Sequence, residues 1–457
     1  MKSVNLSFLL LAFLASSCMT PKKENDSKVR LITLDPGHFH AALVQKSMYE
    51  GVDSTVYVYA PAGEELVQHL KKIEAYNHDS LHPTQWKEVV YTGSDFLEKM
   101  LTQKKGNAVV ISGNNHRKTE YILKSVEGGF NVLADKPMAI DQKNFEVLKD
   151  AFKAAARQKV LLYDIMTERS EITNALQREL AALPEVFGSL QKGTPEHPAV
   201  EMESVHYFYK SVSGNILMRP AWFMDVAQQG EGITDVATHL VDLVQWECFP
   251  DKTIDYQKDI QIIGANRWST AMTLDQFSAI TKLTSFPDYL KTKVDKNKVL
   301  QLFVNGEIDY KLCGTYVRIK ALWDYKATAG GDKHYSRLNG TKASLIIKQG
   351  AEQLFKPTLF IEPVAGGDAE SYNRTLQSTF KRVEAKFPGI ELKKTTAGWE
   401  VVIPEKYKVG HEAHFAQVTT RFLEYLEKGN IPAWEVPNMI AKYYTTTQAL
   451  EMAKNSN

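Results

Sequence analysis

The sequence predicts an α/β domain built on a doubly wound parallel sheet, followed by an α+β domain with an open, largely antiparallel sheet. Three observations indicate this arrangement. Short apolar strands alternate with helical segments up to about residue 165, strands of alternating polarity dominate afterwards, and 457 residues exceed the usual size of one domain. We therefore expect a first domain at 29–165 and a second at 166–457.

The first domain shows repeated strand–helix cycles. Apolar strands are expected at 29–34 and 54–60 with a helical segment at 41–50 between them, and a strand–helix–strand cycle covers 108–134. Such strands are typical of a parallel sheet covered on both faces, where ligands bind beyond the carboxyl ends of the strands. The residues expected at those ends are Asp35 to Gly37, Ser112 to Asn115 and Asp135 to Pro137.

The second domain is rich in strands. Alternating polarity is clearest at 300–312, where Asn305-Gly306 is a hairpin signal, and strands are also expected at 315–327 and 342–350. The closing segment 411–430 has apolar residues at helical spacing, so the chain is expected to end in helices packed on the body.

The first 18 residues predict export. One Lys, an apolar run from Phe8 to Leu14 and small residues precede Cys18, which resembles a bacterial lipobox with Cys18 as the lipidated residue. A plain secretory signal cut nearby is the alternative. Residues 19–28 are expected to be a linker. We therefore expect a periplasmic or cell-surface protein whose soluble body meets the membrane only through a lipid anchor.

The charge balance argues against a nucleic-acid partner. There are 55 basic and 54 acidic residues, giving a net charge of +1 without a block of one sign, which favours a small neutral partner. After Cys18 only Cys248 and Cys313 remain, and the sequence leaves open whether they form a disulfide.

A lysine follows the last strand of the second cycle, in Asp135-Lys136-Pro137. The segment 108–140 resembles the glucose-fructose oxidoreductase / inositol dehydrogenase (Gfo/Idh/MocA) family, where Glu-Lys-Pro stands at this position. The resemblance implies an N-terminal Rossmann domain with NAD or NADP as cofactor. It also implies that the Lys136 ammonium bridges the nicotinamide ribose and a substrate hydroxyl.

A second match covers 219–249, which resembles the family's Gly-rich turn and Asp-x-x-x-His helix. Asp235 and His239 are four residues apart, hence on one helix face, with Asp242 one turn further. An imidazole beside a carboxylate can accept a hydroxyl proton near neutral pH. A helix-capping Asp and a core His are the alternative reading.

The first βα turn departs from the family pattern. Where Gly-x-Gly-x-x-Gly is usual, Asp35 and His40 replace the first and third glycines, and only Gly37 remains to let the backbone approach a pyrophosphate. The acidic residue expected after the second strand is absent, so the sequence does not separate NAD from NADP. His38 and His40 either grip phosphates or are structural turn residues.

The resemblance implies an oxidoreductase that moves hydride between a sugar, polyol or glycoside hydroxyl and a nicotinamide, in a homo-oligomer. Lys136 and His239 would handle the hydroxyl, and Asp235 would orient them. The expected substrate contacts are Trp222, Tyr207 and Arg169. The expected cofactor contacts are Gly37, His38, Phe39, His40, Asn114, Asn115, Asp135 and Lys136.

Two other functions stay open, and one expectation concerns how the cofactor is used. His38 and His40 with Asp235, His239 and Asp242 would suit a metal-dependent hydrolase, although no metal is expected in the leading interpretation. A carbohydrate-binding lipoprotein without chemistry is the other. Because free dinucleotide is scarce outside the cytoplasm, we expect a tightly held cofactor that is recycled within the site.

Overall fold

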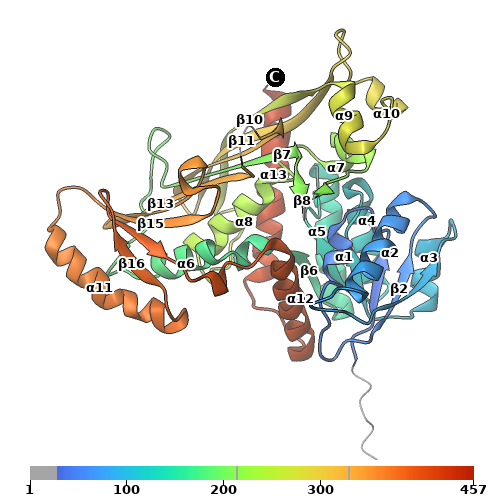
Figure 1. Cartoon of the computed structure of the whole chain (residues 1–457), viewed down its shortest axis with the longest axis horizontal. Helices are drawn as coiled ribbons and strands as arrows, with labels where there is room; N and C mark the ends of the chain where they lie inside the picture. Colours follow the sequence, from blue (N-terminus) through green and yellow to red (C-terminus); the bar gives the residue numbers. More distant parts are fainter. Residues whose placement is uncertain (1–27, 213–214, 328–329, 457) are drawn as a thin grey trace, which may run out of the picture.

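The computed structural model describes residues 28–212, 215–327 and 330–456 (Figure 1). The predicted signal 1–18 with Cys18, and the predicted linker apart from Lys28, lie outside the described residues. Within the described ranges, no helix is both long and apolar enough to cross a membrane.

The N-terminal sheet has six parallel strands in the order β3-β2-β1-β4-β5-β6. The strands are β1 Leu31–Leu34, β2 Thr55–Tyr59, β3 Lys87–Tyr91, β4 Ala108–Ile111, β5 Asn131–Asp135 and β6 Leu162–Ile165. The chain moves outward from β1 to β3 and then restarts at β4 on the other side of β1. Right-handed crossovers then place helices on opposite faces, which confirms the predicted doubly wound fold.

The helices of this half lie between its strands. They are α1 His40–Leu43, α2 Glu64–Asn77, α3 Phe96–Gln103, α4 Asn115–Glu127 and α5 Gln142–Gln158. Helix α4 starts before the predicted residue 118 because the Asn114 side chain caps it, accepting the His116 N–H. Helix α1 is much shorter than the predicted 41–50. The Tyr49 hydroxyl donates to the Val44 carbonyl, which a continuing helix would use itself.

The C-terminal sheet has nine strands in the order β10-β11-β12-β7-β13-β14-β15-β17-β16, and only β12 and β7 pair in parallel. Its strands are β7 Val200–Tyr209, β10 Ile260–Met272, β11 Leu300–Leu312, β12 Thr315–Lys326, β13 Lys333–Asn339, β14 Ala343–Gln349, β15 Thr358–Pro363, β16 Glu391–Lys394 and β17 Trp399–Val402. The short strands β8 Ser211–Val212 and β9 Asn215–Ile216 pair separately. The predicted open, largely antiparallel sheet is thus confirmed.

The hairpin expected at Asn305-Gly306 is wrong, because β11 runs straight through it. The Asn305 amide donates to the Trp268 carbonyl and its side-chain oxygen accepts the Trp323 N–H, so it ties β11 to both neighbouring strands. A Cβ at Gly306 would lie 2.2 Å from the Ile233 side chain. Glycine therefore allows close packing here instead of a turn.

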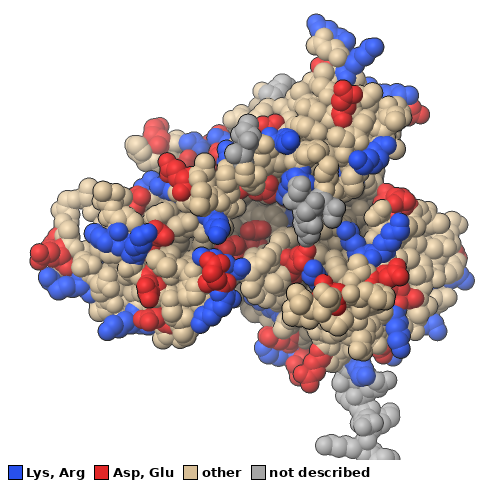
Figure 2. Space-filling model, in the orientation of Figure 1, with Lys and Arg blue, Asp and Glu red and all other residues tan. Residues whose placement is uncertain are grey.

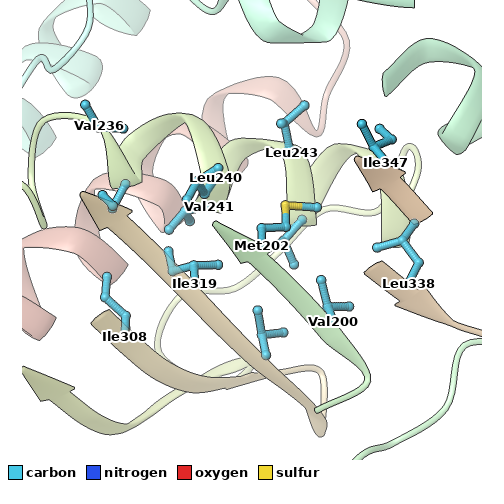
Figure 3. Packing of buried hydrophobic residues seen from close by; sticks show 14 of the residues in the cluster. Val200, Met202, Val236, Leu240, Val241, Leu243, Ile308, Ile319, Leu338 and Ile347 are labelled. Carbon is cyan, nitrogen blue, oxygen red and sulfur yellow. The ribbon is translucent and has the colours of Figure 1, made fainter. Parts of the chain in front are cut away.

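Helix α8, Ala237–Cys248, covers one face of the large sheet (Figure 3). Its Leu240, Val241 and Leu243 lie over Met202 of β7 and Ile319 of β12, and all five are at most 1% exposed. Full burial of an aliphatic side chain is worth about 1.5–3 kcal/mol. This apolar face fixes the position of His239, which belongs to the same helix.

The remaining helices complete the second half. They are α6 Ile172–Ala181, α7 Val226–Gln229, α9 Leu274–Thr281, α10 Asp288–Lys291 and α11 Ala369–Lys386, with 3-10 turns η1 Thr167–Ser170, η2 Ala221–Met224, η3 Ala351–Gln353 and η4 Glu405–Tyr407. Cys248 and Cys313 are both free.

The chain ends in two helices, α12 His411–Lys428 and α13 Glu435–Asn455, as predicted. Helix α13 runs between the two halves (Figure 1) and contacts α5, α8 and β10. Phe415 and Tyr443 join the N-terminal core, while Leu450 joins the C-terminal core. These helices hold the two sheets together.

Candidate active site

A cavity of about 470 Å³ lies where the carboxyl ends of the parallel strands meet the second half of the chain. In the view of Figure 2 the surface is hollowed between the two halves, and charges of both signs are interspersed over the visible face. The expected site residues that line the cavity are His38, Phe39, His40, Asn115, Asp135, Lys136, Asp235 and His239. The volume suits a small-molecule site.

Lys136 and Asp235 form an ion pair across the cavity wall. Lys136 follows β5, after which the peptide bond to Pro137 is cis, and its Nζ donates to Asp235 Oδ1 at 2.8 Å. Burial lowers the pKa of Lys136, but the carboxylates of Asp235 and Asp135 outweigh burial and raise it above the usual range. Burial opposes ionisation of Asp235, yet the Lys136 ammonium lowers its pKa. Both groups are therefore charged at neutral pH.

His239 lines the same cavity as a neutral imidazole. Burial, reinforced by the Lys136 charge, lowers the pKa of His239 well below its usual 6.5. Its Nδ1 is buried without a hydrogen-bond partner among the described residues. The expectation that Asp235 orients His239 needs correction, because Asp235 precedes α8 and its two oxygens accept from Lys136 and Gln229.

The turn after β4 joins the same wall. The Asn115 amide donates to the Gln229 carbonyl at 2.6 Å, and Lys118 Nζ donates to Asn115 Oδ1. Lys118 is buried, which lowers its pKa to about 8. Asn114 lies outside the cavity lining, where its amide donates to the Gln228 side chain at 2.7 Å.

His38 and His40 approach Asp135. The Nδ1 atoms of His40 and His38 lie 3.0 Å and 3.3 Å from Asp135 Oδ2, which also accepts from Ser112 Oγ at 3.0 Å. Burial lowers the pKa of both imidazoles. In this arrangement the Nδ1 atoms face a carboxylate and not an open phosphate site.

The Trp222 indole lies beside Gly37. A Cβ placed on Gly37 would lie 3.4 Å from Trp222 Cζ2 and 3.5 Å from Gly113 Cα. Trp222 is 9% exposed and outside the cavity lining. Trp222 was expected to contact the substrate, but its indole packs on the first βα turn.

Two further expected substrate contacts lie elsewhere. Tyr207 is buried on β7, and because side chains alternate along a strand it points away from the face on which His206 lines the cavity. Arg169 is also outside the lining. Its guanidinium donates to Asp242 at 2.7 Å and to Glu435 at 3.0 Å, so its role is structural.

The ligand set of the alternative function, a metal-dependent hydrolase, does not assemble. Asp242 pairs with Arg169 and Lys442, and Asp235 pairs with Lys136, so neither joins His38 and His40. The histidines meet Asp135 instead.

Several cavity residues were not predicted from the sequence. They are His206, Lys210, Arg219, Asp332, His334 and His411. Asp332 Oδ2 accepts a hydrogen bond from Lys210 Nζ at 2.8 Å and lies 3.1 Å from His206 Nδ1. Asp332 directly precedes β13 and is far in sequence from His206 on β7. The only sequence signal was alternation along β7, which places Ser204 and His206 on one face.

The parallel sheet is of the type that binds dinucleotides, and its strand ends face a second, sheet-rich domain. A lysine–aspartate pair and an imidazole lie between the two. Together these features define a two-domain oxidoreductase architecture. The comparisons with known proteins agree. Residues 36–164 match the model "Oxidoreductase family, NAD-binding Rossmann fold", and residues 176–454 match "Putative oxidoreductase C terminal domain". The chain belongs to the Gfo/Idh/MocA oxidoreductase family, whose cofactor is a nicotinamide dinucleotide.

Solved structures show the same fold over nearly the whole chain. A "putative oxidoreductase" from Parabacteroides merdae ATCC 43184 is 53% identical with a TM-score of 0.92, covering 94% of this chain and 98% of that one. Levoglucosan dehydrogenase in complex with NADH and levoglucosan is 12% identical with a TM-score of 0.58, and an oxidoreductase domain protein from Kribbella flavida is 15% identical with a TM-score of 0.60. Both cover 94% of this chain and 98% of their own. No curated protein matched the chain.

The cavity residues fit the nicotinamide end of a dinucleotide better than its pyrophosphate. Asn115, Lys136 and Asp235 supply the polar groups that a nicotinamide ribose and a substrate hydroxyl require, and they line the cavity. The pyrophosphate end is less well provided, because Gly37 is the one glycine left in the first βα turn and it lies outside the cavity lining.

Gly37→Val is predicted to lower the dinucleotide content of the purified protein, because a branched side chain takes the space in which the pyrophosphate approaches. The fold should persist, since a Cβ there meets nothing closer than 3.4 Å. Gly264→Val in β10 is the control, because a Cβ there meets no atom within 4 Å. Unchanged dinucleotide content in Gly37→Val would place the pyrophosphate elsewhere.

Proposed function

We propose that the protein oxidises or reduces a hydroxyl-bearing carbon of a sugar, polyol or glycoside, with a nicotinamide dinucleotide in this cavity. The observation that carries the proposal is the charged Lys136–Asp235 pair beside the neutral His239 at the end of the parallel sheet. An ammonium and an uncharged imidazole together can bind a hydroxyl oxygen and remove its proton.

The chain's own residues divide the work in the direction of oxidation. The Lys136 ammonium donates a hydrogen bond to the substrate oxygen and stabilises its developing negative charge, while Asp235 holds the ammonium in place. The hydroxyl proton passes to His239. The bound nicotinamide would supply the acceptor for the hydride that leaves the same carbon.

We also propose that the cofactor stays bound between turnovers. The support is the predicted export signal at 1–18, which would place the protein where free dinucleotide is scarce. A cofactor that survives export and purification needs a dissociation constant of about a nanomolar or less, roughly 12 kcal/mol. A second substrate, or a later step of the same reaction, must then return the hydride.

Purification without added cofactor tests the proposed function. Mass spectrometry of the denatured full-length protein should detect a nicotinamide dinucleotide, and glycosides or polyols should turn over without external NAD. Cofactor-free protein that turns over only with millimolar NAD would indicate an ordinary exchanging dehydrogenase. Protein that binds carbohydrate with neither cofactor nor turnover would indicate a binding protein instead.

A homo-oligomer is part of this proposal. Strand β10 is an edge of the large sheet and exposes Ile263 at 41% and Trp268 at 38%. Exposed apolar side chains on an edge strand favour association with another copy. Light scattering of the purified protein tests this, and a monomer at micromolar concentration would contradict it.

His239→Gln is predicted to lower kcat by about a hundred- to ten-thousand-fold, because a side-chain amide cannot accept the hydroxyl proton. In the wild type, protonation of His239 should not lower kcat/KM until the pH drops below 6.5, since burial keeps the pKa of His239 well below that value. The pH profile of kcat/KM checks this. A limb above pH 6.5 that disappears in His239→Gln would contradict the lowered pKa, and a wild-type kcat in His239→Gln would contradict the role as base.

A further inference from the structure

Three possible metal ligands converge beside the proposed catalytic pair. His38 and His40 come from the turn after β1, Asp135 ends β5, and one ligand atom from each lies within 4.8 Å of the others. The two Nδ1–Oδ2 distances are 3.3 Å for His38 and 3.0 Å for His40. All three residues line the cavity, so an ion between them would face its interior.

Part of this cluster is unsatisfied in the structure. Asp135 Oδ1 is buried without a hydrogen-bond partner among the described residues, and so is His38 Nδ1, which approaches Asp135 without the alignment of a hydrogen bond. Asp135 is 3% exposed. Buried polar atoms without partners are rare in native proteins and call for a ligand or a functional reason.

We propose that His38, His40 and Asp135 bind one divalent transition-metal ion, with Zn²⁺ as the best fit. Zinc–nitrogen and zinc–oxygen bonds of about 2.0–2.1 Å at tetrahedral angles put neighbouring ligand atoms about 3.3 Å apart. The observed separations of 3.3 and 3.0 Å are close to this spacing. Two imidazole nitrogens disfavour Ca²⁺ and Mg²⁺, which prefer oxygen ligands.

The surroundings of His40 suit a ligand that binds through Nδ1. Its Nε2 lies 3.4 Å from Nε2 of His411, on α12. If the Nε2–H of His40 donates to His411, the lone pair of Nδ1 is free for a metal. Metal-binding histidines commonly donate their other ring N–H in this way. His411 is therefore inferred to be the residue that orients His40.

The set has two histidines and one carboxylate, which leaves one tetrahedral position open toward the cavity. Three protein ligands with an open position are typical of catalytic zinc sites, where a water or a substrate oxygen fills the fourth position. Lys136 lines the same cavity as the three proposed ligands. The metal proposal does not depend on the proposed function, because it concerns binding of the ion alone.

Metal analysis of the full chain tests the proposal. The protein is produced without a polyhistidine tag, and its metal content is measured before and after treatment with a chelator. We expect about one zinc per chain. Adding Co²⁺ to the stripped protein should give the visible absorption of a tetrahedral site, and Zn²⁺ should raise its melting temperature.

His38→Gln, His40→Gln and Asp135→Asn should each lower zinc affinity by at least about tenfold. His69→Gln is the matched control, because His69 is also buried without a partner but lies on α2. Circular dichroism checks that the variants fold. The wild-type titration needs no variant, so folding failure of a variant leaves the test intact. Wild-type protein that binds neither ion, or variants that keep wild-type zinc affinity, would overturn the proposal.

Discussion

Lys136→Ala is expected to lower kcat by about a hundred- to ten-thousand-fold, with a smaller change in KM, because the ammonium acts most strongly on the charge that develops in the transition state. Its Nζ is 2.8 Å from Asp235 Oδ1, and Lys136 lines the cavity. Without it the substrate oxygen loses the cationic hydrogen-bond donor of the Lys136–Asp235 pair. The measurement is steady-state kinetics on the substrate that turns over with the purified protein.

Two controls separate a catalytic loss from a structural one. Lys149→Ala removes a partly exposed ammonium whose partner Glu146 is 64% exposed, and it should leave kcat unchanged. Added primary amines should restore part of the rate to Lys136→Ala if a missing ammonium is the cause. A rate within a few-fold of wild type in Lys136→Ala would show that the lysine does not act at the reacting carbon.

Asp242→Asn is expected to cost about 3–5 kcal/mol of stability, because it leaves buried cations short of a partner. Asp242 Oδ2 accepts from Arg169 Nε at 2.7 Å, and Oδ1 accepts from Arg169 Nη2 at 2.7 Å and Lys442 Nζ at 2.8 Å. The three side chains are at most 3% exposed. They join η1, α8 and α13, so the loss should weaken the contact between the halves.

The pKa of Asp242 predicts how the stability of the protein depends on pH. Burial raises the pKa of Asp242, but Arg169 and Lys442 outweigh burial and hold it below its usual 3.8. The stabilisation that ionised Asp242 contributes to the folded state is therefore present above pH 3.8. It is lost as the pH falls through the lower pKa of the folded state.

Urea unfolding of wild type and Asp242→Asn, followed by circular dichroism, measures the effect. Asp150→Asn is the control, since Asp150 is 65% exposed and its pair with Lys153 should contribute little to stability. A loss in Asp242→Asn no larger than in this control would contradict the assigned role of the buried network.

The sequence was informative wherever local pattern and burial agree. Strands β1 and β4 are short apolar runs and are buried along their whole length, as a parallel sheet covered on both faces requires. The prediction failed at Asn305-Gly306, because the same dipeptide that favours a turn also permits close packing inside a long strand. Tertiary contacts decided between these two uses.

In the candidate site, too, residues of local motifs were predicted, and contacts between distant segments were missed. Lys136, Asp235 and His239 were found because they belong to local motifs, and the structure brings all three to one cavity. Arg169 was misplaced because its partner Glu435 lies 266 residues later, a pairing that no local pattern reveals. The approach of His38 and His40 to Asp135 was missed for the same reason.

Transfer of deuterium from substrate to cofactor tests the central claim most directly. A glycoside or polyol deuterated at the reacting carbon is mixed with the purified protein, the reaction is stopped during the first turnover with cold alkaline solvent, and the released dinucleotide is analysed by mass spectrometry. We predict a reduced nicotinamide about one mass unit heavier than the unlabelled form, and no such product with Lys136→Ala. Labelled substrate that turns over while the dinucleotide carries no deuterium at any time point, the first turnover included, would contradict hydride transfer at this site.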